Sequence, residues 1–203
     1  MNRYLQEMKN ALSGFYNKAK EYERNVEQAK QRYQPDIAAE EIKKFDSSLE
    51  ADKRAAINTI TDAKDQGIQA AQRWAALDGS NIDDGDMKLL KFDLSPDQFA
   101  ALVDKHRNNG TMCFILKQYA EKHSRQEQKD GEFLAWDSLS SVDVPTVEEK
   151  IKAYNQFAES AIATVNNMTG YGWGKGVSNP VIESSVKNFG TPNQFNYKWL
   201  EVL

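Results

Sequence analysis

The chain has 203 residues and a formal net charge of −4, with 28% charged and 40% hydrophobic residues and a mean hydropathy of −0.72. This length suits one sizeable domain or two small ones. A single cysteine excludes an intramolecular disulfide framework and a cysteine-rich metal site, and two histidines leave few ligands for a transition metal. We find no apolar run of about 18 residues that could span a membrane, and no signal-peptide pattern at the start.

Charge is distributed unevenly along the chain. Residues 78–149 carry 8 Lys/Arg and 15 Asp/Glu, whereas residues 1–77 carry 13 and 12, and residues 150–203 carry 5 and 3. The acidic balance and the lack of a basic block argue against a general nucleic-acid-binding protein, which needs a face rich in lysine and arginine. We interpret the acidic middle segment as a solvated face.

The first predicted element is a long amphipathic helix over residues 3–33. Its apolar residues recur at alternating steps of three and four, which is the pattern of a coiled-coil seam. Pro35 ends this helix and is well placed at the start of a second one, which continues to about Leu77 with a less regular repeat. The candidate partner-binding residues on the seam are Leu5, Met8, Leu12, Phe15, Tyr22, Val26 and Tyr33.

The connection at Pro35 leaves two arrangements open. In a hairpin, the two helices bury each other's apolar residues within one chain, whereas a single kinked rod leaves both seams to partner chains. Gly67 is a position of weak helix propensity within the second helix, and Asp78-Gly79 is the predicted helix stop. We therefore expect a coiled-coil-like region over residues 1–78, an acidic loop over 79–94 and a compact helical domain over 95–203.

The acidic segment, residues 79–94, is predicted to be a loop followed by a short extended piece. Its aspartates surround Gly85 and invite comparison with a calcium-binding EF-hand. Aligning Gly85 with the invariant glycine of that motif places Lys91 where a bidentate glutamate is required. The sequence therefore favours a turn rich in aspartate and glycine over a calcium site.

Two short helices are predicted after this loop. Ser95 and Gln98 form a capping box around a proline, which is a strong helix-start signal, and a second helix follows over residues 111–123. We expect both to pack near Trp74 at the end of the long helix. Cys113 lies in an apolar run without a cation close in sequence, so we interpret it as a buried structural cysteine rather than a nucleophile.

The last part of the chain is predicted to contain two further helices and two segments to which we assign no definite function. A capping box at Thr146 begins one helix, and Asn179-Pro180 begins a short helix that ends at Gly190. Between them, residues 170–176 alternate glycine with other residues but match neither a Walker A loop nor a Rossmann fingerprint. This loop and the apolar tail, which could be a strand, a docking helix or a partner-binding tail, supply further candidate binding residues: Tyr171, Trp173 and Lys175, and Phe195, Tyr197, Trp199 and Leu200.

Taken together, the pattern predicts an all-α protein, and we identify no catalytic, metal-binding or cofactor-binding residues. With its heptads over residues 5–33 and its aromatic end over 195–203, the chain resembles the small helical structural or scaffolding proteins of tailed bacteriophages and prophages. That resemblance implies a cytoplasmic or virion-associated homo-oligomer that assembles with itself or with a shell protein. The alternatives are a bacterial helical adaptor or effector-type domain that binds one protein partner, and a helical enzyme that uses residues 170–176.

Overall fold

The computed structural model describes residues 2–129, 139–169 and 176–191, except for the side chains of residues 124–129 and 140. All regular elements in these ranges are helices, which confirms the predicted all-α class. None of the described helices is long and apolar enough to cross a membrane. The elements are α1 (Arg3–Arg32), α2 (Pro35–Trp74), η1 (Gly79–Asn81), α3 (Asp84–Leu89), α4 (Pro96–His106), α5 (Gly110–Lys129), η2 (Leu139–Ser141), α6 (Val147–Met168) and α7 (Pro180–Asn188).

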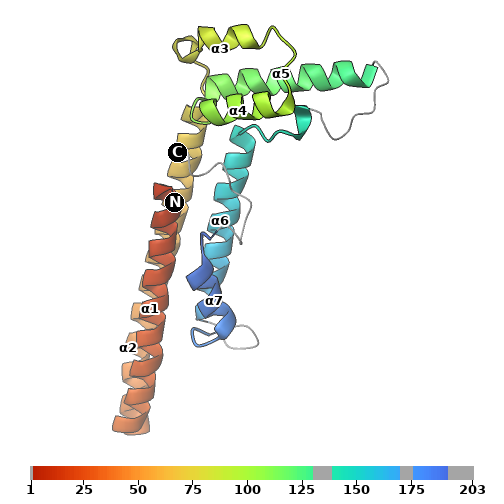
Figure 1. Cartoon of the computed structure of the whole chain (residues 1–203). Helices are drawn as coiled ribbons and strands as arrows, with labels where there is room; N and C mark the ends of the chain where they lie inside the picture. The colour runs from red at the N-terminus through yellow and green to blue at the C-terminus, as the bar shows by residue number, and fades with distance from the viewer. Residues whose placement is uncertain (1, 130–138, 170–175, 192–203) are drawn as a thin grey trace. The chain divides into compact units, whose positions relative to one another are not determined.

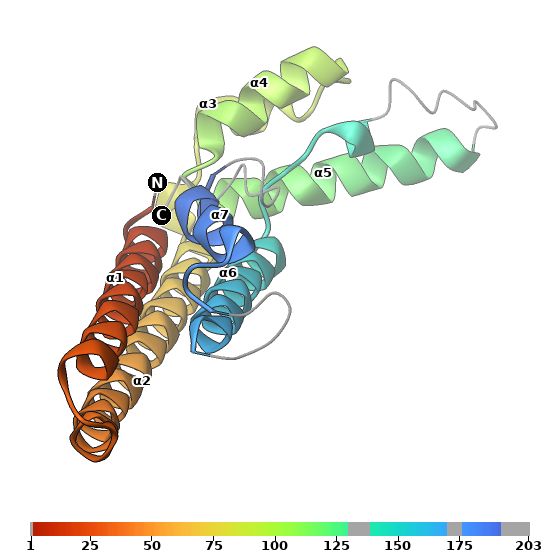
Figure 2. The same ribbon diagram turned by 90° about the horizontal axis from the view of Figure 1, so that it is seen from below.

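Helices α1 and α2 form an antiparallel hairpin, which decides between the two arrangements left open at Pro35. They pack together along their length (Figures 1 and 2). The Tyr22 hydroxyl donates a hydrogen bond to Asp46 Oδ1 at 2.5 Å, and so links the two helices. The hairpin explains how the seam can be buried without a second chain.

Contacts divide the chain into two units. Unit 1 contains the described residues up to Gly67 and those from Ala153 to 191, and unit 2 contains Ile68–Lys152. This division differs from the predicted segments 1–78, 79–94 and 95–203. The difference arises because α6 and α7, which come late in the sequence, pack with the long hairpin.

The core of unit 1 lies where α6 and α7 pack against the hairpin. Phe157 of α6 meets Phe189 at the end of α7 edge-on, with ring centroids 5.6 Å apart. Gly190 follows with a φ of 74°, a backbone conformation that suits glycine at a helix end. The buried apolar residues include Leu5, Met8, Leu12, Phe15, Tyr16 and Ala19 of α1, Ala56, Ile60 and Ala63 of α2, Tyr154, Phe157, Ala158, Ala161, Val165 and Met168 of α6, Ile182 and Val186 of α7, and Val177 and Phe189 on either side of α7.

Helices α2 and α6 approach each other closely at Gly67. A Cβ at this position would lie 2.6 Å from Cε1 of the fully buried Tyr154 ring. The Tyr154 hydroxyl accepts a hydrogen bond of 2.6 Å from Nδ2 of Asn2, whose side-chain oxygen also caps α1. Gly67 is thus a packing requirement of unit 1.

Unit 2 has its own core, formed mainly by α4 and α5. The predicted capping box at Ser95 and Gln98 is present, and Trp74 packs against the core as expected. The core residues are Phe99, Leu102, Val103, Cys113, Leu116, Tyr119, Ala120, Leu139 and Val144. All of these residues belong to unit 2.

Two predictions for unit 2 were wrong. The segment 79–94 contains η1 and α3 rather than a loop and an extended piece, because the Asp83 side chain accepts hydrogen bonds from the backbone N–H groups of Gly85 and Asp86 and caps α3. Helix α5 continues to Lys129, beyond its predicted end near His123. Polar residues after the apolar stripe concealed this extension.

We expect opposite effects from replacing two helical glycines of unit 1 with alanine. Gly67→Ala should lower the free energy of unfolding by about 1–3 kcal/mol, because the new methyl group overlaps the Tyr154 ring. Gly14→Ala, with nothing within 4 Å of its Cβ, should raise it by about 0.5–1 kcal/mol. Urea denaturation monitored by circular dichroism measures both, and equal effects would contradict the close packing at Gly67.

Candidate functional site

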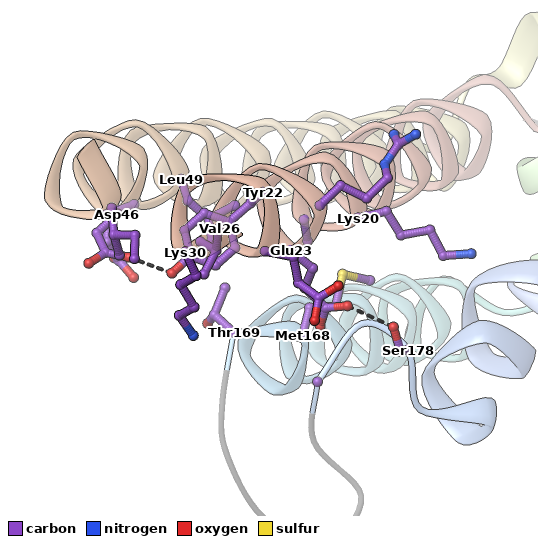
Figure 3. Close-up of a pocket in the computed structure, with 16 residues that line it drawn as sticks. Lys20, Tyr22, Glu23, Val26, Lys30, Asp46, Leu49, Met168, Thr169 and Ser178 are labelled. Atoms are coloured by element: carbon purple, nitrogen blue, oxygen red, sulfur yellow. Dashed lines mark hydrogen bonds between the residues drawn. The ribbon is translucent and has the colours of Figure 1, made fainter. Parts of the chain in front are cut away.

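A groove with a volume of about 1170 Å³ lies in unit 1 between the hairpin and the point where α6 ends and α7 begins (Figure 3). Its residues come from α1, α2, the end of α6 and the residues just before α7. It is lined by Ala19, Lys20, Tyr22, Glu23, Arg24, Val26, Glu27, Lys30, Ile42, Asp46, Leu49, Glu50, Met168, Thr169, Gly176 and Ser178. The groove is therefore built from segments far apart in the sequence.

Hydrogen bonds hold the edges of the groove in place. The Ser178 hydroxyl donates to Glu23 Oε2 at 2.7 Å, and the two side chains point toward one another in Figure 3. Nζ of Lys53 donates to the Thr169 hydroxyl at 3.1 Å and so joins α2 to the end of α6. These contacts fix the end of the groove that adjoins α6 and α7.

The groove combines an apolar floor with a charged rim. Val26, Leu49 and Met168 are buried or half-buried and contribute to the floor. The rim carries both signs of charge, from Lys20, Arg24 and Lys30 and from Glu23, Glu27, Asp46 and Glu50. An apolar strip flanked by charges is the pattern with which a helix binds another helix.

The structure separates the predicted seam into two parts. Leu5, Met8, Leu12 and Phe15 are buried in the core of unit 1 and already contact the chain's own helices. Tyr22 and Val26 line the groove, and Tyr33 lies half exposed near the hairpin turn. Only the second part of the seam is therefore placed where a partner could reach it.

The other candidate residues lie outside the described residues. These are Tyr171, Trp173 and Lys175 of the glycine-rich loop, and Phe195, Tyr197, Trp199 and Leu200 of the tail. Sequence reasoning did not find Ile42, Asp46 and Leu49 as groove residues. A signal was available, since they share one face of the second helix, but the hairpin geometry was needed to place that face beside Val26.

A polar cluster in unit 2 joins α3 to α4. Asp86 Oδ2 lies 2.5 Å from both Lys105 Nζ and His106 Nε2, and Asp83 Oδ2 lies 3.5 Å from the same lysine. The hydrogen bonds from Lys105 and then His106 hold the pKa of Asp86 below its ordinary value. Asp83, Asp86 and His106 have ligand-type atoms within 4.8 Å of one another. The lysine ammonium already supplies a positive charge there, so we interpret the cluster as a structural ion-pair network.

A buried lysine, Lys150 of α6, lies close to the core of unit 2. Its side chain is 1% exposed, and its ammonium lies 4.6 Å from the centroid of the Trp74 ring. Burial lowers the pKa of Lys150 to about 8 and raises that of the Cys113 thiol to about 11. The buried cysteine donates to the carbonyl oxygen of His106 at 3.3 Å, which agrees with its predicted structural role.

Comparisons of the chain with protein-family models, with curated proteins and with solved structures find no match.

The ion pairs of Asp86 should make the free energy of unfolding depend on pH in the acid range. Because the folded-state pKa of Asp86 lies below the ordinary 3.8, its ionised form stabilises the fold above that value, and this stabilisation is lost as the pH falls through the lowered pKa. Asp86→Asn should therefore cost about 1–3 kcal/mol at neutral pH and progressively less below about pH 4. Denaturant titrations across this range measure the difference, with the exposed Asp84→Asn as control. A constant difference at every pH would contradict the role of the ionised carboxylate.

Lys150 should also make stability rise with pH, but in the alkaline range. The unfolded chain binds this proton with the ordinary pKa of 10.5 and the folded chain with a pKa of about 8. The free energy of unfolding should therefore rise between these two values, by at most about 3 kcal/mol. Lys150→Met should remove the rise, whereas the exposed Lys152→Met should retain it. Parallel pH profiles for wild type and Lys150→Met would contradict the effect of burial.

Proposed function

We propose that this chain is a non-enzymatic interaction protein that takes part in an assembly and binds protein through the α1–α2 hairpin. The observation that carries the proposal is the groove, with its apolar floor of Val26, Leu49 and Met168 and its charged rim. Its open side is lined by helices, so a helix of another chain could extend the packing of unit 1.

The titratable side chains that cluster in unit 2 support a structural role rather than a catalytic one. Asp86 is held by Lys105 and His106, and Lys150 and Cys113 are buried in helix packing. None of these five residues lines the groove. The groove itself offers paired charges and apolar surface, which suit recognition of a protein better than activation of a nucleophile.

An assembly component similar to the helical structural or scaffolding proteins of tailed bacteriophages is the form of this function that we favour. The support is architectural: a long hairpin with a surface near its turn, joined to smaller helices. A bacterial adaptor would use the same groove for one different protein. The two forms differ in the partner and share the surface, so one experiment can address both.

Photo-crosslinking from the groove tests the proposal on the full-length chain. A benzophenone amino acid in place of Lys30, which lines the groove, should give an adduct of one defined mass, either with the purified chain itself or with a protein in an extract of the source cells. The same probe in place of Arg32, which projects from the opposite face of α1, should give at least tenfold less product. Mass spectrometry of the adduct identifies the partner.

A second variant ties the adduct to the groove floor. Val26→Asp in the probe-bearing chain should abolish crosslinking, because a charge replaces the half-buried floor residue. Leu12 is unsuitable for this purpose, because it is fully buried in the core of unit 1 and its replacement by aspartate would unfold the hairpin. Equal adducts from positions 30 and 32, or none from either, would overturn the proposal.

A further inference from the structure

The part of the hairpin formed by residues 19–50, here called the distal hairpin, is only partly covered by the other described residues of unit 1. Elsewhere in unit 1, α6 and α7 pack on α1 and α2, and in Figure 1 the hairpin extends beyond the ends of both. The structure describes every residue of the distal hairpin, and Leu49 is its only large apolar residue that is buried. Tyr33 and Ile37 are 50% and 51% exposed. Among the described helices, none covers the end of the hairpin that extends beyond α6 and α7.

The face of α1 that lines the groove is self-complementary when its direction is reversed. Ala19, Glu23, Val26 and Lys30 follow one another at steps of four and three and so share one face of α1, and Tyr33 follows three residues later as the residue that caps the helix end. In order, these positions are apolar, acidic, apolar, basic and apolar. An antiparallel copy of the same face places Glu23 opposite Lys30 twice, and Val26 opposite Val26.

Ile42 of α2 lies at the same level along the hairpin as Val26 of α1. The hydrogen bond between Tyr22 and Asp46 fixes the register of the hairpin. Val26 lies one turn beyond Tyr22 toward the hairpin turn, and Ile42 lies one turn beyond Asp46 in the same direction, about 6 Å along each helix. A two-fold axis at the level of Val26 and Ile42 therefore pairs each of these groove residues with its own copy.

We propose that the partner bound by the distal hairpin is a second copy of this chain, arranged antiparallel about this two-fold axis. The inference rests on the proposed function and identifies its partner. The two distal hairpins form a four-helix bundle, in which each copy adds two helices to the exposed part of the other. Tyr33, which is 50% exposed in the single chain, is then covered by the second copy near the end of α6.

The hydrogen bond already made by Glu23 is compatible with this arrangement. Ser178 donates to Oε2 of Glu23, and a carboxylate has about four acceptor positions. The bond holds the Glu23 side chain at the edge of the groove before the second copy binds. Pre-ordering of this kind lowers the entropic cost of forming the intermolecular ion pair.

Charge reversal with heterodimer rescue tests this arrangement. Sedimentation velocity at low salt, over about a hundredfold range of concentration, should show a reversible dimer of the full-length wild-type chain. Glu23→Lys alone and Lys30→Glu alone should each weaken the dimer roughly tenfold or more, because like charges then face each other at both pairs. An equimolar mixture of the two variants should dimerise again. In the mixed dimer the two introduced charges face each other at one pair, the native Glu23 and Lys30 face each other at the other, and both pairs are of opposite sign.

Matched controls separate this effect from misfolding. Glu21→Lys and Arg32→Glu make the same charge changes on the opposite face of α1 and should leave the dimer unchanged. Ser178→Ala removes the hydrogen bond to Glu23 without changing charge, and should weaken the dimer less than Glu23→Lys does. Circular dichroism verifies that each variant retains its helices.

The outcomes distinguish this inference from the proposed function. A wild-type chain that remains monomeric, or a mixture that fails to dimerise, overturns the second copy as partner. A monomer that still crosslinks through position 30 to one other protein overturns only this inference and supports an adaptor. A monomer without any adduct from position 30 overturns the proposed function as well.

Discussion

The contact between Tyr154 and Gly67 is the constraint on which unit 1 depends. The buried ring of Tyr154 lies so close to Gly67 that no side chain fits between α6 and α2. The same tyrosine accepts a hydrogen bond from Asn2, the cap of α1, and meets the Tyr4 ring edge-on at 6.1 Å. Burial raises the pKa of the Tyr154 hydroxyl to about 12. One side chain thus joins three helices from opposite ends of the sequence.

This close packing has a consequence for the rest of the hairpin. Where α6 and α7 cover α1 and α2, residues such as Leu12 and Ile60 are fully buried, and the seam acts as a core. Helix α6 ends at Met168, while the apolar repeat of α1 continues through Val26 to Tyr33. The same heptad pattern therefore stabilises the fold in one half and presents a groove in the other. A surface of this kind favours recognition of a helix, including one from a second copy.

Unit 2 places its charged groups differently. Lys150 is buried against the Trp74 ring, and this burial lowers the pKa of Lys150 to about 8. The Asp86 carboxylate accepts hydrogen bonds from a lysine and a histidine. Buried charges of this kind destabilise the fold unless they are paired or contact an aromatic face. They join helices at positions separated by about 20 residues or more in sequence. These contacts fix the geometry of a structural core and contribute nothing to the groove.

The sequence by itself determined the helical class, the break at Pro35, the capping box at Ser95 and the burial of Cys113, because each depends on local spacing or backbone chemistry. It also indicated the apolar face that contains Val26, but it could not say which of its residues the chain itself covers. Only the tertiary structure decided that Leu12 is core, that Gly67 admits the Tyr154 ring, and that Ile42 and Asp46 lie beside α1. The physical reason is that the spacing of apolar residues in α1 shows which face of the helix is apolar. The helices that cover part of this face, α6 and α7, come more than a hundred residues later in the sequence.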